Sequence, residues 1–243
     1  MTPPEAIVKE SMPPDLMYFD AYYEPSSIVQ GNRTGHWSEL TGTYGYTHGK
    51  VTGYAAISRY QRFDDSDFSA VIGAYFNMPD SYIHSEIGAG WYVDYIYHFQ
   101  VITEYGHKIL ENLYGQMGFN FRDYSSGNTY VAYPGLIYYF GNSYLAADYG
   151  AIFIQNRGTG NFGTFKGDFA ITDFLRMTSS ATVGQWLYDI YGLAPSKEFG
   201  YILSIGLNMK VYKGINARVG YSYSAEDPKF IKRSMQFGLS ARF

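Results

Sequence analysis

KRSMQFGLSARF, residues 232–243, ends the chain and sets the pattern against which the rest is interpreted. Every second side chain, counted back from the end, is apolar, and the side chains between them are polar or small. Successive side chains of a β-strand point to opposite faces, so this pattern predicts a strand with one apolar and one polar face. The two preceding segments, 201–211 and 215–223, alternate in the same way. The C-terminal region is therefore predicted to consist of amphipathic strands.

The composition departs from that of an ordinary soluble domain. Of 243 residues, 19% are aromatic, with 27 tyrosines, and only 16% are charged, whereas soluble domains carry about 25% charged residues. The formal net charge of −4 supplies no basic stripe for phosphate contacts, which argues against a nucleic-acid partner. Cysteine is absent, so the chain can form neither a disulfide nor a thiolate metal site.

The chain divides into a short lead and one β domain. Residues 1–16, MTPPEAIVKESMPPDL, are charged and Pro-rich and lack the apolar core of a signal peptide. We interpret them as a periplasmic lead or linker and residues 17–243 as a single domain. No uninterrupted apolar run reaches the roughly 18–20 residues of a spanning helix. Any membrane segment must therefore be made of strands.

About fourteen segments show strand periodicity, with twelve or sixteen strands as alternatives. Each is near or above the roughly 9–11 residues that a tilted spanning strand requires. The predicted strands are 17–28, 37–48, 50–63, 67–78, 82–91, 98–108, 115–125, 129–140, 144–156, 163–174, 177–187, 199–211, 215–226 and 230–243.

The connections between these segments alternate between tight and longer. This alternation is typical of outer-membrane barrels, which have short periplasmic turns and longer external loops. The tight set contains 48–49, 78–81, 141–143, 175–176 and 212–214, with 109–114 as its loosest member. The longer set contains 29–36, 64–67, 92–97, 157–162 and 188–198, with 126–128 and 227–229 as short exceptions.

Barrel size decides which face points outward. Eight strands already enclose an interior that side chains fill, and the diameter grows with strand number. Fourteen strands around an apolar lumen would leave a dry void, which close packing does not tolerate. A β-sandwich would need a solvent face rich in Lys and Glu, whereas this face is rich in Gly, Ser and Asn. The sequence therefore predicts an all-β fold, a transmembrane antiparallel up-and-down β-barrel in the outer membrane of a Gram-negative bacterium, in contact with lipid and lipopolysaccharide.

Aromatic residues near the strand ends are predicted to lie at the membrane–water interfaces, where rings with an apolar body and a polar edge collect. The alternative is that they cap a soluble barrel. An amphipathic last strand that ends in Phe resembles the signature by which the insertion machinery recognises outer-membrane barrels, so Phe243 is interpreted as an assembly signal. The predicted interfacial residues are Trp37, Trp91, Trp186, Tyr138, Tyr139 and Tyr212.

Two stretches carry a resemblance to a known family. Residues 115–149 read GQMGFNFRDYSSGNTYVAYPGLIYYFGNSYLAADY, and residues 58–76 read SRYQRFDDSDFSAVIGAYF. The first resembles the G-x-R-x-x-Y strand and Y-Y-F-G-N hairpin of the YaiO family of outer-membrane barrels, and the second resembles that family's R-x-x-D hairpin. The resemblance implies a barrel and a role in the envelope, with a tetratricopeptide-repeat or polysaccharide-export protein as partner. It implies no catalytic residues.

The candidate motifs for catalysis or cofactor binding lack the context that such sites need. GTGNFG, residues 158–163, matches a dinucleotide fingerprint, but the residues after it alternate as a strand, and the fingerprint needs a helix there. The histidines show no metal-ligand spacing. We therefore expect no cofactor, no metal and no enzymatic activity, although outer-membrane enzymes exist. The histidines are His36, His48, His84, His98 and His107.

Charged residues on the polar face are predicted to line the lumen as a ladder of opposite signs. One interpretation is a selectivity lining, and the other, which we favour, is a cross-braced interior. In the predicted register Glu86 lies opposite Glu104, and Arg122 on the next strand bridges both carboxylates. The predicted ladder contains Glu39, Glu86, Glu104, Arg122, Asp148, Lys166, Asp168, Lys210, Arg218 and Arg242.

These features favour a conduit or an envelope anchor, linked through the family resemblance to exopolysaccharide export. The alternatives are a surface-binding barrel with a plugged lumen and, less favoured, an outer-membrane enzyme.

Overall fold

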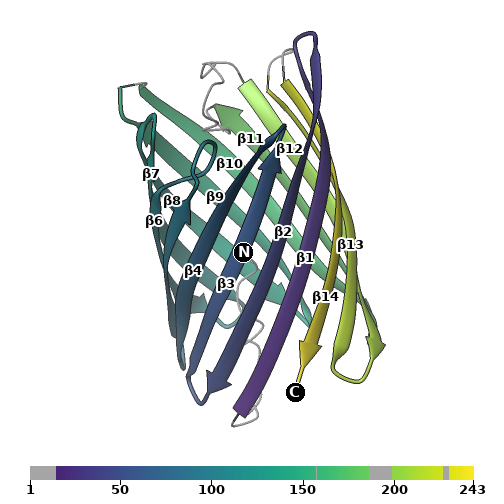
Figure 1. Ribbon diagram of the computed structural model, residues 1–243. Coiled ribbons are helices and arrows are strands. Elements are labelled where there is room, and N and C mark those ends of the chain that lie inside the picture. Colours follow the sequence, from purple (N-terminus) through teal and green to yellow (C-terminus); the bar gives the residue numbers. More distant parts are fainter. Residues whose placement is uncertain (1–14, 157, 186–198, 227–229) are drawn as a thin grey trace.

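Fourteen strands form one closed barrel, in which each strand pairs antiparallel with its two neighbours in sequence and β1 pairs with β14 (Figure 1). The computed structural model describes residues 15–156, 158–185, 199–226 and 230–243. The strands are β1 (Asp15–Gln30), β2 (Arg33–His48), β3 (Val51–Arg62), β4 (Asp65–Met78), β5 (Ser81–Trp91), β6 (Phe99–Leu110), β7 (Leu113–Tyr124), β8 (Gly127–Phe140), β9 (Ser143–Ile154), β10 (Gly158–Thr172), β11 (Leu175–Gln185), β12 (Phe199–Tyr212), β13 (Ile215–Glu226) and β14 (Phe230–Arg242).

The predicted strand number and antiparallel order are confirmed, whereas some strands begin or end a few residues from the predicted positions. At the end of the barrel where β1 starts, all six hairpins leave two residues between strands. The predicted turn at 175–176 lies instead at 173–174, beside a register shift between Ala170 and Thr172. We call the end of the barrel where β1 starts the short-turn end. Gly49, Gly141 and Gly214 occupy turns there with positive φ, which glycine adopts without steric cost.

The opposite end, which we call the loop end, is less uniform than predicted. The predicted loops 29–36 and 64–67 are mostly strand, and only two residues separate β1 from β2 and β3 from β4. The connection from β5 to β6 spans residues 92–98 and is the longest within the described part of the chain. The predicted loop 188–198 lies outside the described residues, as do residues 1–14 of the predicted lead.

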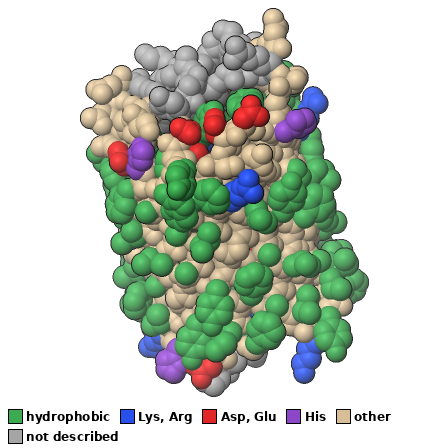
Figure 2. All heavy atoms as spheres, in the orientation of Figure 1, with side chains coloured by type: hydrophobic (Ala, Val, Ile, Leu, Met, Phe, Trp, Pro, Cys, Tyr) green, Lys and Arg blue, Asp and Glu red, His purple; other side chains and the backbone are tan. Residues whose placement is uncertain are grey.

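The apolar face of each strand points away from the lumen, as the size argument predicted. Ile72 is 64% exposed and Leu239 is 58% exposed, although both stand in the middle of strands. On the face shown in Figure 2, hydrophobic side chains are spread over the middle of the wall, while most charged side chains lie toward the two ends. Within the described residues, no helix is both long and apolar enough to cross a membrane.

The barrel closes between its first and last strands. Their ladder runs from Tyr18 opposite Arg242 to Gln30 opposite Phe230. Beyond it, Phe243 and Met17 exchange two backbone hydrogen bonds of 2.9 and 3.2 Å, and the Phe243 ring is 79% exposed. The two described ends therefore lie side by side at the short-turn end.

Glycines inside the barrel let tyrosine rings lie flat across the neighbouring strand. A Cβ placed on Gly118 would come within 2.0 Å of the Tyr133 ring, and one on Gly106 within 2.1 Å of the Tyr82 ring. A side chain at either position would therefore force the tyrosine ring to move. The inner wall is thus assembled from interlocking Tyr–Gly pairs.

Candidate functional site

All ten charges of the predicted ladder occupy inward register positions. Two of them, Lys166 and Asp148, pair with each other at 2.9 Å between Nζ and Oδ2. Others pair with charges outside the predicted set: Arg218 with Asp20 of β1 at 3.2 Å, and Asp168 with Arg176 at 2.6 Å. Glu39 accepts a hydrogen bond of 3.2 Å from Thr41. The inward positions are fixed by the continuous ladders around the barrel.

The predicted pairing of Glu86 with Glu104 is wrong by two residues. Glu86 lies opposite Ile102, and Glu104 lies opposite His84. The shift arises because the β5–β6 ladder ends at Ala89 opposite Phe99, after which the chain turns inward as a loop. A slip of two residues keeps both carboxylates on the inward face.

Glu86 is held by neutral donors. Tyr54 Oη donates to Glu86 Oε2 at 2.6 Å, and Gln100 Nε2 donates to Oε1 at 2.8 Å. Arg122 Nε donates to Gln100 Oε1 at 3.3 Å, so the guanidinium reaches the carboxylate through the amide. The predicted direct bridge from Arg122 to both glutamates is therefore wrong, because Gln100 stands between β5 and β7. Glu86 is only 2% exposed, which makes these bonds important.

Glu104 accepts hydrogen bonds from two tyrosines, which reach it from opposite sides. The hydroxyl of Tyr82 on β5 donates to Oε1 at 2.5 Å, and the hydroxyl of Tyr133 on β8 donates to Oε2 at 3.3 Å. Opposite Glu104, His84 stacks on Tyr75 with 4.1 Å between ring centroids. The His84 Nε2 lies 2.8 Å from the Tyr54 hydroxyl. Tyrosine hydroxyl groups thus bind both glutamates, and we call these two groups of contacts the tyrosine–glutamate network.

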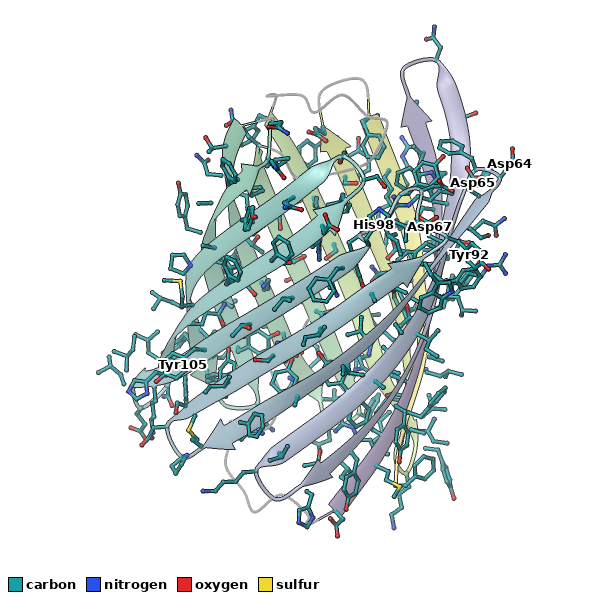
Figure 3. All side chains as sticks on the ribbon, turned by 60° about the vertical axis from the view of Figure 1, so that its left-hand side comes forward. Asp64, Asp65, Asp67, Tyr92, His98 and Tyr105 are labelled. Carbon is teal, nitrogen blue, oxygen red and sulfur yellow. The ribbon has the colours of Figure 1, made fainter. Side chains whose placement is uncertain are left out.

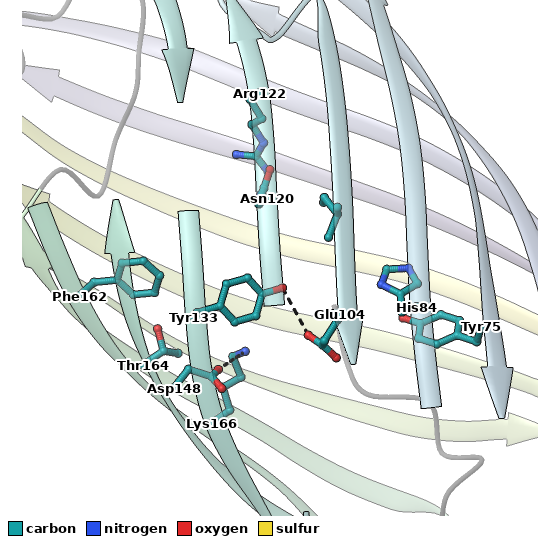
Figure 4. A pocket seen from close by; sticks show the side chains of 11 residues that line it. Tyr75, His84, Glu104, Asn120, Arg122, Tyr133, Asp148, Phe162, Thr164 and Lys166 are labelled. Atoms are coloured by element: carbon teal, nitrogen blue, oxygen red, sulfur yellow. Dashed lines mark hydrogen bonds and ion pairs between the residues drawn. The ribbon is translucent and has the colours of Figure 1, made fainter. Parts of the chain in front are cut away.

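Beside this network lies a cavity of about 310 Å³ (Figure 4). Its lining combines aromatic rings with charged and amide groups, and Glu104–Tyr133 and Asp148–Lys166 are bonded across it. The Oδ1 atom of Asn120, on β7, is buried and has no hydrogen-bond partner within the described residues. The cavity therefore presents both stacking surfaces and polar groups to its contents.

The opposite wall of the lumen is small and hydroxyl-rich. One lateral row of the ladder places serines next to one another on five adjacent strands, from β11 through β14 to β1. Two neighbouring pairs in this row are hydrogen-bonded, at 2.7 and 2.8 Å. The row could not be seen in the sequence, since neighbouring serines of the row are at least 12 residues apart and only the register aligns them. They are Ser180, Ser204, Ser222, Ser234 and Ser26.

A second ionic network closes the seam between β1 and β14. Glu24 accepts hydrogen bonds from Lys232 Nζ at 2.8 Å and from Gln236 Nε2 at 3.1 Å, and the Tyr22 hydroxyl also donates to it. Lys232 and Gln236 lie more than 200 residues from Glu24 in sequence. Glu24 and Lys232 are not among the predicted site residues, because the register that closes the barrel cannot be aligned from the sequence alone.

The loop of residues 92–98 folds over the inward face at the loop end. It is anchored by Asp67 of β4, which is 1% exposed. This carboxylate accepts backbone hydrogen bonds of 3.1, 2.8 and 3.0 Å from the amides of Asp94, Tyr95 and Ile96. Asp67 lies among the residues labelled at this end in Figure 3, far from Tyr105. The loop therefore narrows one side of the mouth.

Arg62 adds a second anchor and explains the position of a tryptophan. Its Nη1 donates to the Tyr95 carbonyl at 3.0 Å, and its guanidinium lies 4.6 Å from the Trp37 ring centroid. Trp37 is 8% exposed and packs with Ile28 and Phe230 inside the barrel. The prediction of Trp37 as an interfacial residue is wrong, because its register position faces inward.

The other predicted interfacial aromatics divide between the two faces. Trp91, Tyr138 and Tyr212 are exposed on the outside. Tyr139 faces inward and packs edge-on against Tyr114, at 5.5 Å between centroids, so its prediction as interfacial is wrong. Adjacent residues of a strand cannot both face lipid. Trp186 lies outside the described residues.

Three exposed cations face the lumen near the short-turn end: Lys210, Arg218 and Arg242. Their exposure despite inward positions means that solvent reaches this end of the lumen.

No protein-family model and no curated protein sequence matches this chain. Among solved structures, the Pseudomonas putida toluene transporter TodX is similar at a TM-score of 0.61 and 10% identity, over 99% of this chain and 93% of that one. A bacterial polysaccharide outer membrane secretin is similar at a TM-score of 0.61 and 10% identity, over 93% of this chain and 98% of that one. The Acinetobacter baumannii outer membrane protein Omp33 is similar at a TM-score of 0.58 and 11% identity, over 94% of this chain and 99% of that one. The fold is that of an outer-membrane β-barrel, and the lipid-facing belt agrees with a place in the outer membrane of a Gram-negative bacterium.

Proposed function

We propose that the barrel is a conduit through the outer membrane for polar, hydroxyl-rich solutes, with saccharides as the class. The observation that carries this proposal is the serine row, which forms a polar inner wall of small side chains opposite the tyrosine–glutamate network. Ser180, Ser204 and Ser222 are partly exposed and small, so they leave space along that wall and can exchange hydrogen bonds with a passing solute. Ser26 and Ser234 are buried and bonded to each other, and they complete the polar wall behind.

The tyrosine–glutamate side supports the saccharide class. Sugar rings present apolar faces that stack on aromatic rings and hydroxyl groups that pair with carboxylates and amides. The cavity offers Tyr75, Tyr133 and Phe162 for the first kind of contact, and Glu104 and Asn120 for the second. A hydrocarbon solute, such as TodX carries, would find this lining unfavourable, because polar groups would lose water without gaining partners.

The finer form of the proposal is a role in exopolysaccharide export. It rests on the resemblance to the YaiO family and on the structural similarity to a bacterial polysaccharide outer membrane secretin. On this proposal residues 1–14 link the barrel to a periplasmic tetratricopeptide-repeat or polysaccharide-export protein. The insertion machinery would act during assembly.

Conductance in planar bilayers tests the conduit. The purified barrel is expected to give steady single-channel currents. Ser204→Trp places a large ring in the serine row and should reduce the current strongly. Ile205→Trp, one residue away, faces lipid and serves as the matched control, which should conduct as the parent does. Equal currents in both variants would place the solute path elsewhere, and an absence of current in the parent would refute the conduit.

A second candidate is a closed envelope anchor, favoured by the inward fold of residues 92–98 and the cross-bracing of the lumen. Electrically silent barrels that remain fully folded would support this candidate instead.

A further inference from the structure

The ion pairs inside the lumen share one orientation. In the pair of Lys166 with Asp148, the lysine side chain is 36% exposed and the aspartate side chain only 3%. The three other lumen pairs of the described chain show the same order, with the cation more exposed than the acid: Arg176–Asp168, Arg218–Asp20 and Lys232–Glu24. The carboxylates therefore lie against the wall and the cations cover them, so a solute in the lumen meets positive charge first.

Two further cations on the inward face lack an acidic partner. Lys210 is exposed, and within the described residues it forms neither an ion pair nor a hydrogen bond. Arg122 forms no ion pair with any described residue, and its neighbours are Gln100, the ring of Tyr97 and the side chain of Tyr124. A guanidinium carries five N–H donors in one plane, so most donors of Arg122 remain for a ligand.

Three lumen carboxylates without a cationic partner in the described chain are covered by neutral donors instead. Glu86 is 2% exposed and accepts hydrogen bonds from a tyrosine and a glutamine. Both oxygens of Glu104 accept from tyrosine hydroxyls, and Glu39 accepts from a threonine. An oxygen that already accepts a hydrogen bond has less capacity for a passing cation. The lumen therefore offers more to an anion than to a cation.

The exposed cations stand at successive heights along the barrel axis. Arg218 lies three residues from the short-turn end of β13, Lys166 six residues from that end of β10, and Arg122 nine residues from that end of β7. A strand rises about 3.3 Å per residue and tilts by about 40° in a barrel, so these cations follow one another in axial steps of about 8 Å. A chain-like solute would meet one cation at each step.

The cavity beside the tyrosine–glutamate network joins two of these steps. Arg122 and Lys166 both line it, and they lie on opposite sides of Tyr133 in Figure 4. The Tyr133 ring offers a surface on which a sugar ring can stack. The cavity therefore combines a contact for the sugar ring with a positive charge on either side of it.

We propose that the barrel carries acidic saccharides, whose carboxylate groups pair in succession with Arg218, Lys166 and Arg122. This inference rests on the proposed function and adds the charge of the solute. The unpartnered Lys210 attracts the solute at the short-turn end, and Arg122 offers a planar fork of donors that matches a carboxylate.

Block of the ion current by saccharides of known charge tests the proposal. A galacturonic acid hexamer should block the parent at a concentration at least about tenfold lower than its neutral methyl ester, which has the same rings without the carboxylate charge. In Arg122→Gln/Lys166→Gln, the blocking concentration of the hexamer should rise close to that of the ester. The matched control is Lys50→Gln/Lys213→Gln, which removes the same charge from turns outside the lumen and should keep the difference. Far-ultraviolet circular dichroism confirms that all three proteins are folded.

The reversal potential in a potassium chloride gradient gives a second readout. The parent should prefer chloride over potassium, and Lys210→Gln should reduce this preference because it removes an exposed positive charge from the short-turn end of the lumen. Lys210→Gln breaks no hydrogen bond or ion pair of the described chain, so its folding is not at risk.

The outcomes separate the charge of the solute from the conduit itself. Equal block by the hexamer and the ester in a conducting parent would overturn the acidic class and leave the conduit in place. A preference of the parent for potassium would overturn the acidic class as well. A parent without current would contradict the conduit, and the inference that rests on it would fall too.

Discussion

Two glutamates of this lumen, Glu86 and Glu104, are stabilised by neutral partners. Glu86 takes its hydrogen bonds from a tyrosine and a glutamine, and Glu104 takes its bonds from two tyrosines. Hydrogen bonds to a buried charged group contribute more than ordinary ones, and leaving such a group unpaired costs more still. The stability of the inner wall should therefore depend on particular hydroxyl groups.

Tyr54→Phe tests this dependence. The variant removes the 2.6 Å bond to Glu86 and the 2.8 Å contact with His84 while it keeps the ring. We expect the free energy of unfolding to fall by about 1–3 kcal/mol, measured from urea unfolding in detergent by tryptophan fluorescence. Tyr44→Phe, on the exposed lipid side of β2, is the control and should change little. An unchanged stability for Tyr54→Phe would mean that water replaces the lost hydroxyl.

The strands and loops of the barrel show which features the sequence could predict. The alternation at residues such as Phe237 and Leu239 depends on nothing beyond the strand itself, so strand number and lipid face could be predicted. Pairing across loops could not, because the inward turn of residues 92–98 moved the partner of Glu86 by two positions. The serine row and the Glu24 network also depend on register between distant segments. Hence the inward face was predictable, while the contacts on it were not.

Gly118→Ala tests the Tyr–Gly pairs between strands. The added Cβ would lie 2.0 Å from the Tyr133 ring, which must move and weaken its bond to Glu104. We expect a loss of about 1–3 kcal/mol in the free energy of unfolding, as for other overpacked sites. Gly42→Ala, where no atom lies within 4 Å of the new Cβ, is the matched control. If both variants melted alike, the ring contact would have no energetic role.

Asp67→Asn tests the anchor of the loop formed by residues 92–98. The amide presents its NH₂ group to backbone donors that now point at carboxylate oxygens, so at least one bond is lost. We expect faster amide hydrogen exchange at residues 94–96. Asp64→Asn, in the exposed turn before β4, should leave that exchange unchanged. Protection that persisted in Asp67→Asn would show that Arg62 alone holds the loop.

At the scale of the whole molecule, the end of the last strand has two separable roles: its backbone closes the barrel, and its terminal ring is the proposed assembly signal. Its backbone closes the barrel through Met17, while the Phe243 ring projects outward and is 79% exposed. The ring therefore contributes little to packing. Its proposed role is recognition by the insertion machinery.

Phe243→Ala keeps the backbone pairing and removes only the ring. We expect the purified, refolded variant to melt within a few degrees of the parent, yet to accumulate at a lower level in the outer membrane of cells. Phe237→Ala, which removes an equally apolar ring from the middle of the same strand, is the control for hydrophobicity. Membrane levels of Phe243→Ala equal to those of the parent would show that the ring is not a signal.

The adjacency of Met17 and Phe243 has a topological consequence. A short linker could join these two ends without distorting the ladder, because they already exchange backbone hydrogen bonds. The chain could then be opened at the two-residue turn between β6 and β7, at the same end of the barrel. Such a circular permutant would keep every strand neighbour while Phe243 became an internal residue. The permutant would therefore separate two properties of the Phe243 ring: its place in the barrel, which is kept, and its place at the chain end, which is lost.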